Sequence, residues 1–243
     1  MHSRARRFAK RLCLALLLGG FSLAVSAQQV EQQSGQEAAA DSSHLDCTAL
    51  DQQPAPQSGR EWLKRSLWAG HCRIYQARAV RVGVDGVRTL ALSHEVHDGA
   101  EREVLRFLDG DPLTFERRGS SVAVIHGAQG PVPASPDAII EHLDARYRFR
   151  LASDKRIAGR SAVRVDIEPL DEYRYGRRLW LDTETALPLK QELLDERSRV
   201  LETFQLVELD GVRLHQGSVA LTPGPLPTAG AWQPNWLPPG FDI

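Results

Sequence analysis

Three groups of side chains have residue types that could do chemistry. The first has the residue types of a metal site. It consists of His94, Glu95 and His97. In an extended segment His94 and His97 point to opposite faces, and their spacing is not that of a helical His-Glu-x-x-His site. We therefore interpret these residues as part of a polar strand face, and we expect neither a metal nor any other cofactor.

The second group is the pair Cys47 and Cys72, since Cys13 falls in the N-terminal leader described below. In an oxidising compartment a disulfide between them would close a loop of 72 minus 47, or 25, positions. Such a loop would stabilise the fold by ~3 kcal/mol by restricting the unfolded chain. Spacing does not fix geometry, so a disulfide and two free thiols both remain open.

The third group is Arg174, Arg177 and Arg178. Guanidinium groups bind carboxylates or phosphates through two parallel hydrogen bonds. In an acidic protein, arginines on strands are more often solvated or paired with Asp and Glu. The sequence contains no nucleophile elbow, phosphate-binding loop or dinucleotide-binding glycine motif. We therefore predict that the protein is not an enzyme.

Seven large apolar side chains are candidates for a lipid-binding cavity or for the hydrophobic core. They are Trp68, Phe107, Phe115, Tyr173, Tyr175, Leu179 and Trp180, with Trp62, Tyr147, Phe149 and Phe204 as further aromatic candidates. A curved sheet that binds an acyl chain needs more apolar surface on its inner face than its own side chains can bury by packing. The sequence does not reveal such an excess, so cavity lining and core packing remain open alternatives for each residue.

The N-terminal segment 1–27 has the features of a secretory signal peptide. Five basic residues precede an apolar run over 12–25, which is too short for a membrane span of ~20 residues. Cleavage after Ala27 would leave 25 Lys and Arg against 31 Asp and Glu, a balance of −6. A net-acidic exported protein is a poor candidate for nucleic-acid binding.

The remaining chain divides by composition into a tether, a domain and a tail. Residues 28–57 contain few large apolar side chains and are predicted to be a disordered tether. The folded domain is predicted over 58–222. Six prolines mark residues 223–243 as a semi-extended tail.

Two helices and about ten antiparallel strands are expected within 58–222. Ser58 and Glu61 fit a capping box for a helix that Gly70 should end, and Ser135-Pro136 should begin the second helix. Four Asp-Gly pairs indicate hairpins: Asp85-Gly86, Asp98-Gly99, Asp109-Gly110 and Asp210-Gly211. A twisted sheet of this size tends to curl, so the fold class is mainly β (α+β), with helices covering the concave side.

The segment 171–206 reads as three extended runs separated by two polar turns. Its alternation predicts Tyr173, Tyr175, Leu179 and Leu181 on one strand face, and Arg174, Arg178 and Trp180 on the other. Pro188 donates no ladder hydrogen bond, which suggests an edge strand or the start of a strand.

The run YRYGRRLWLDTETALPLK at 173–190, followed by VLETFQ, resembles the signature of the MucB/RseB family. The similarity continues more weakly from Trp62 to Gln216. It implies a lipoprotein-carrier-like (LolA-like) half-barrel. The family usually has Gly where this chain has Ala186, and a positive φ there would cost about 1 kcal/mol without Gly. A smaller second domain begins in the family near a WLPPGF-like segment; here Ile243 follows closely, so we expect most of that domain to be missing.

The resemblance also implies a function. Family members are periplasmic negative regulators of an envelope-stress sigma factor: they bind the periplasmic part of a membrane-anchored anti-sigma factor, shield it from proteolysis, and sense lipid or lipopolysaccharide. Without a second domain, we expect this chain to bind that partner weakly or with help from another subunit. A periplasmic carrier of lipids or lipoproteins is the alternative, and an exported enzyme is a third.

Overall fold

The computed structural model describes residues 44–119, 124–127, 130–133, 135–222 and 235–238, all within one compact unit spanning Ala40–Ile243. The predicted signal peptide and the tether residues 28–43 lie outside the described residues. The helical segments are η1 (Cys47–Ala49), α2 (Gly59–Cys72) and α3 (Pro136–Asp144). The strands are β1 (His44–Asp46), β2 (Arg73–Gly83), β3 (Gly86–His97), β4 (Ala100–Phe107), β5 (Thr114–Arg118), β6 (Val124–Gly127), β7 (Gly130–Pro133), β8 (Tyr147–Ile157), β9 (Arg160–Pro169), β10 (Gly176–Asp182), β11 (Pro188–Leu194), β12 (Val200–Leu214) and β13 (Ser218–Ala220).

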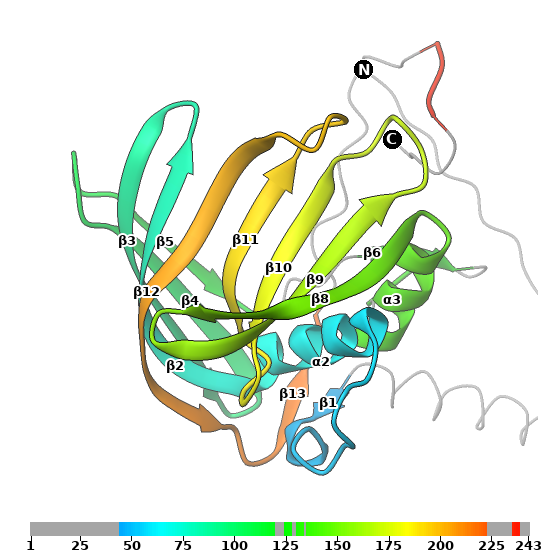
Figure 1. The fold of residues 1–243 in the computed structure, drawn as a ribbon. Helices are drawn as coiled ribbons and strands as arrows, with labels where there is room; N and C mark the ends of the chain where they lie inside the picture. Colours follow the sequence, from blue (N-terminus) through cyan, green and yellow to red (C-terminus); the bar gives the residue numbers. More distant parts are fainter. Residues whose placement is uncertain (1–43, 120–123, 128–129, 134, 223–234, 239–243) are drawn as a thin grey trace, which may run out of the picture. The chain divides into compact units, whose positions relative to one another are not determined.

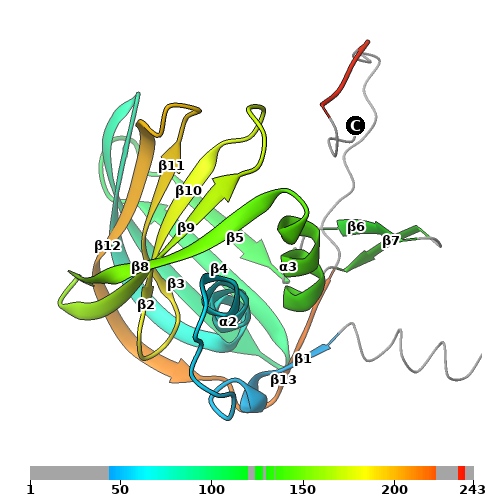
Figure 2. The ribbon, with the colours of Figure 1, turned by 45° about the vertical axis from the view of Figure 1, so that its right-hand side comes forward.

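The main element is a nine-stranded antiparallel sheet in the order β5-β4-β3-β2-β12-β11-β10-β9-β8. It curves around α2, which lies on the concave side (Figures 1 and 2). The outermost strands β5 and β8 do not pair with each other, so the sheet stays open. Curvature is introduced at register shifts in the β8–β9, β10–β11, β11–β12 and β12–β2 pairings, because bulges bend strands. The predicted half-barrel covered by helices is confirmed.

Both helices begin at the residues that the sequence indicates. The Ser58 hydroxyl accepts a hydrogen bond from the Glu61 N–H, and the Glu61 carboxylate accepts one from the Ser58 N–H, each 3.2 Å long. Helix α2 continues past Gly70 to Cys72, because its buried stripe ends there. That stripe repeats every three residues: Leu63, Ser66, Ala69 and Cys72. The Ser135 hydroxyl caps α3, with Pro136 in its first turn.

Three clusters of buried side chains form the core, and α2 takes part in two of them. Ala69 and Cys72 pack with Leu45, Leu50 and Val219 near β1 and β13. Leu63 packs with Ile140 of α3 and with the inward-facing residues of β9. The third cluster lies between strands and contains Ala79, Leu90, Trp180, Leu189 and Leu206.

The prediction of a disordered tether is wrong for residues 44–57. Strand β1 pairs with β13, and the Cys47 N–H donates to the Gly217 carbonyl at 3.0 Å. Cys47 and Leu50 are both 0% exposed. The polar composition concealed a few apolar residues that have long-range partners.

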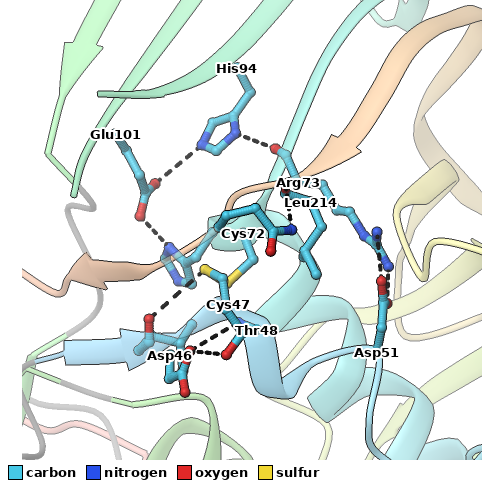
Figure 3. The surroundings of a disulfide bond; sticks show 12 residues. Asp46, Cys47, Thr48, Asp51, Cys72, Arg73, His94, Glu101 and Leu214 are labelled. Atoms are coloured by element: carbon cyan, nitrogen blue, oxygen red, sulfur yellow. Dashed lines mark hydrogen bonds and ion pairs between the residues drawn. A yellow bond between two sulfur atoms is a disulfide. The ribbon is translucent and has the colours of Figure 1, made fainter. Parts of the chain in front are cut away.

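Cys47 and Cys72 form a disulfide, with their Cα atoms 5.3 Å apart (Figure 3). The bond joins η1 to the last residue of α2. It therefore fastens the N-terminal segment, together with β1, to the helix that fills the concave side of the sheet.

Two local predictions are corrected by the structure. Asp210-Gly211 lies inside β12 and makes no hairpin; the register shifts between Asp210 and Arg213, and Gly211 has a φ of 61°, as in a bulge. Tyr173 and Tyr175 precede β10 in an irregular loop, so they do not share a strand face with Leu179. The other three Asp-Gly pairs do connect neighbouring strands. Pro188 is the first residue of β11, a central strand.

Ala186 occupies the left-handed backbone region with a φ of 61°. The turn between β10 and β11 requires this conformation, because the Ala186 N–H donates to the Asp182 carbonyl at 2.8 Å and the Asp182 N–H donates to the Leu187 carbonyl at 2.9 Å. The strain costs about 1 kcal/mol. The buried methyl group packs with Leu187 and offsets part of that cost.

We expect the double variant Cys47→Ala/Cys72→Ala to unfold more easily. The loop-closure model assigns the disulfide ~3 kcal/mol, which corresponds to a decrease in Tm of about 6–12 °C for a chain of this size. Thermal unfolding with and without reductant measures it, and the double variant should not respond to reductant. An unchanged Tm in the double variant would contradict the stabilising role.

Trp180→Ala should be severely destabilising, because the side chain is 6% exposed and packs in the third cluster. Loss of transfer free energy and the resulting cavity should cost ~3–5 kcal/mol. Chemical denaturation gives this free energy of unfolding. Phe115→Ala, at a 57% exposed aromatic of the same sheet, is the matched control and should cost much less. Equal losses in the two variants would show that Trp180 is not a core residue.

Candidate functional site

An apolar cavity of about 270 Å³ lies on the helix-facing side of the sheet. Its lining residues come from β2, β3, β4, β11, β12 and the turn before β11: Tyr75, Leu92, Glu103, Leu105, Leu187, Pro188, Gln191, Phe204 and Leu206. Tyr75 and Leu187 belong to the same cluster as Ala69 and Cys72 of α2, which fixes the side of the sheet.

Cross-strand pairing explains why a cavity forms here. Leu92 of β3 lies opposite Leu105 on β4 and opposite Ala77 on β2. Next in register, Leu206 and Leu90 flank Ala79. These pairings bring Leu92, Leu105 and Leu206 of the cavity wall to one face of neighbouring strands, because opposite side chains lie only about 5 Å apart.

Few polar groups reach this cavity, and its carboxylate is already paired. Glu103 accepts hydrogen bonds from Arg117 at 2.8 and 3.0 Å. Burial, reinforced by the negative charge of Glu103, raises the pKa of Tyr75 to about 12, so its hydroxyl stays neutral. The arrangement suits an alkyl chain with a polar group at one end. Its volume is just below the ~300–1,000 Å³ of typical ligand pockets.

A buried polar cluster adjoins the cavity beside the disulfide. The His71 Nδ1 lies 2.7 Å from Glu101 Oε1, and the His94 Nε2 lies 3.4 Å from Glu101 Oε2. His94 Nδ1 donates to the Arg73 carbonyl at 2.6 Å, since a carbonyl only accepts (Figure 3). Burial alone would raise the pKa of Glu101, but hydrogen bonds and charge from both histidines outweigh it and hold the pKa at about 2.

This cluster connects helix, sheet and cavity. His71 is on α2 and Glu101 on β4, while the His94 ring stacks on Tyr75 with centroids 5.7 Å apart. Arg117 reaches Glu103 and lies 3.7 Å from Glu101. The interpretation of His94 as part of a polar surface is wrong, because it is buried; His97 is exposed on the other face. Among the described residues no three His, Cys, Asp or Glu side chains are placed to hold a metal ion.

The seven candidate residues divide into core and surface, and none lines the apolar cavity. Trp68, Phe107 and Leu179 pack against the core clusters, and Trp180 is part of one. The prediction of core or cavity is wrong for Phe115, Tyr173 and Tyr175, which are 57%, 48% and 56% exposed. Of the four further aromatic candidates, Phe204 lines the cavity, whereas Trp62, Tyr147 and Phe149 pack against a core cluster. Period-two alternation marks Leu92 and Leu105 as inward-facing, but the sequence does not show which strands lie opposite each other.

The predicted arginine cluster lies at a second, charged cavity of about 470 Å³ between the β9–β10 loop and the β11–β12 turn. Arg174 is buried and pairs with Asp171. Arg178 pairs with Glu192 at 3.4 Å and reaches Asp166 at 4.0 Å. Arg177 is exposed on the same strand. These guanidinium groups are mostly matched by carboxylates of the chain itself, as expected from the acidic composition.

In the part of the chain that the structure covers, no helix has the length and apolar character needed to cross a membrane.

Comparison with known proteins gives a consistent family match. The model of the MucB/RseB N-terminal domain matches residues 58–228. The sigma factor AlgU regulatory protein MucB of Pseudomonas aeruginosa is 34% identical over 211 residues, covering 78% of this chain and 66% of that protein. The sigma-E factor regulatory protein RseB of Escherichia coli K12 is 24% identical over 208 residues, covering 76% and 65%. The matched part of the chain thus spans just under two thirds of these curated relatives.

Solved structures agree in fold. The P. aeruginosa MucA/MucB complex matches with a TM-score of 0.57 and 32% identity, over 75% of this chain and 67% of that chain. MucB in complex with MucA(peri) matches with a TM-score of 0.55 and 33% identity, over 75% and 65%. The family model covers well over half of the chain, and the half-barrel is shared with MucB. The chain therefore belongs to the MucB/RseB family.

Proposed function

We propose that this protein is a periplasmic negative regulator of an envelope-stress sigma factor. It binds the periplasmic part of a membrane-anchored anti-sigma factor and shields that segment from proteolysis. The observation that carries this proposal is the similarity to MucB over 75% of the chain, at 33% identity, in a structure in which MucB is bound to MucA(peri).

The site chemistry supports a binding role over catalysis. Glu101 is saturated by two histidines, and the Asp182 carboxylate accepts from Arg160 at 2.9 and 3.0 Å and from the Thr185 hydroxyl at 2.6 Å. Groups that are paired inside the fold are poorly placed to exchange protons with a substrate. These pairings support a protein that acts by binding its partner.

Two features of the chain support its export from the cytoplasm. The leader at 1–27 has the organisation of a signal peptide, and the disulfide of Cys47 and Cys72 is suited to an oxidising compartment. Both features support the periplasm as the proposed site of action.

The partner proposal is tested by titrating the purified chain with the periplasmic segment of the anti-sigma factor from the same organism. We expect saturable binding with a Kd that is micromolar or tighter, a free energy of at least about −8 kcal/mol. A protease added to the mixture should cleave the bound segment more slowly than the free one.

A shuffled-sequence segment of equal charge is the control for the titration and for the cleavage assay. Equal affinity for the native and shuffled segments, or unchanged cleavage at saturating chain, would contradict the proposal.

A second role, lipid sensing, is favoured by the apolar cavity. Its aliphatic and aromatic walls and its paired carboxylate match one acyl chain with a polar head at the mouth. In this role lipid binding changes the affinity for the anti-sigma segment. A lipid or lipoprotein carrier is the alternative, and it would bind lipid without any change in that affinity.

We expect Leu105→Trp to lower the affinity for a fluorescent fatty-acid probe by about tenfold or more, because the indole fills the cavity. Val104→Trp is the matched control, since Val104 is the preceding residue of β4, is also partly buried, and faces the other side of the sheet. Thermal unfolding of both variants accounts for overpacking of ~1–3 kcal/mol. Equal probe binding by the two variants would exclude the cavity as the lipid site.

A further inference from the structure

The loop between β9 and β10 presents apolar side chains to solvent from a well-fixed backbone. Leu170, Tyr173 and Tyr175, which we call the tyrosine patch, are 53%, 48% and 56% exposed. The Leu170 N–H donates to the Arg146 carbonyl at 2.9 Å, and the Tyr173 N–H donates to the Asp171 carboxylate at 3.0 Å. An exposed apolar group on an ordered loop is typical of an interaction surface.

One segment of the chain is already seated on this patch. The Trp236 ring meets the Tyr173 ring edge to face, with centroids 5.6 Å apart and planes at 69°. Trp236 is still 63% exposed, so the contact covers only part of the indole. An aromatic pair of this geometry changes an equilibrium by roughly 2- to 12-fold. The contact is therefore weak enough to open.

The segment around Trp236 has the composition of a proline-rich ligand. Pro234 precedes Asn235 and Trp236, and Leu237, Pro238 and Pro239 follow. Proline restricts the backbone of such a segment before it binds, so little entropy is lost on docking to aromatic side chains. The two tyrosines of the patch supply aromatic side chains of this kind.

The patch adjoins the charged cavity of the site. Leu170 belongs to the patch and also lines that cavity, together with Asp171 and Arg174 of the same loop. The patch and the charged cavity therefore share the β9–β10 loop.

We propose that the tyrosine patch is a docking site for the chain's own Trp236-Leu237-Pro238 segment, and that this contact is a releasable latch. Release exposes the patch to a partner segment with the same aromatic and proline chemistry. This inference does not depend on the proposed anti-sigma partner, since it concerns a contact within the chain.

The full-length chain labelled with 5-fluorotryptophan tests the latch by ¹⁹F NMR. Its five tryptophan signals can be assigned by single substitutions. We expect Tyr173→Ala to move the Trp236 signal toward that of a solvent-exposed indole and to raise the exchange of the Asn235, Trp236 and Leu237 amides by roughly 2- to 12-fold. Phe115→Ala removes a similarly exposed aromatic elsewhere on the sheet and should change neither readout.

A second measurement tests recognition rather than mere proximity. Trp236→Ala labelled with 3-fluorotyrosine has four tyrosine signals, and a synthetic Asn-Trp-Leu-Pro-Pro-Gly-Phe peptide is added at millimolar concentration, the effective concentration of a short tether. The Tyr173 signal should shift, and a peptide with Trp replaced by Ala should leave it unchanged. An unmoved Trp236 signal in Tyr173→Ala, equal effects of Phe115→Ala, or no response of Tyr173 to the peptide would each overturn the proposal.

Discussion

The fold depends on covering the concave face of the sheet with helix α2. A curved antiparallel sheet exposes an apolar inner face, and the strands cannot close over it because β5 and β8 remain apart. Helix α2 supplies the cover with a stripe that enters two core clusters, through Leu63 at one end and Ala69 and Cys72 at the other. The capping box, the disulfide and the His71–Glu101 ion pair all fix this one helix, from its first turn to its last.

The apolar cavity lies where the sheet meets the C-terminal end of α2. Its walls come from β2, β3, β4, β11 and β12, and the cavity residue Tyr75 shares a core cluster with Ala69 and Cys72 of α2. The buried Glu101 and its two histidines lie beside the cavity, since the His94 ring stacks on the cavity residue Tyr75.

Much of the architecture could be predicted from local signals. Ser58 and Ser135 cap their helices, three Asp-Gly pairs make their turns, and Leu90, Val163 and Val165 face inward as their alternation indicates. Predictions failed where the local structure depends on residues that are distant in the sequence. Residues 44–50 are ordered by β13 and Cys72, and Gly211 forms a bulge because β12 continues along β2. The cavity is assembled from five strands, so neither composition nor spacing could identify its walls.

The central pairing of the sheet has a consequence for how the chain acquires its structure. Strands β2 and β12 are neighbours although Arg81 and Glu202, which form an ion pair between them, are 121 positions apart. Likewise, β1 can pair only after β13, at the other end of the domain, is available. A topology rich in such distant contacts folds in milliseconds to seconds, well after hairpins such as β2–β3 have formed. A chain that crosses a membrane N-terminus first therefore presents β2 as an open edge until β12 emerges. During that interval the bond between Cys47 and Cys72, whose partners are only 25 residues apart, can form before the sheet exists. Oxidation of the two cysteines can thus precede formation of the sheet.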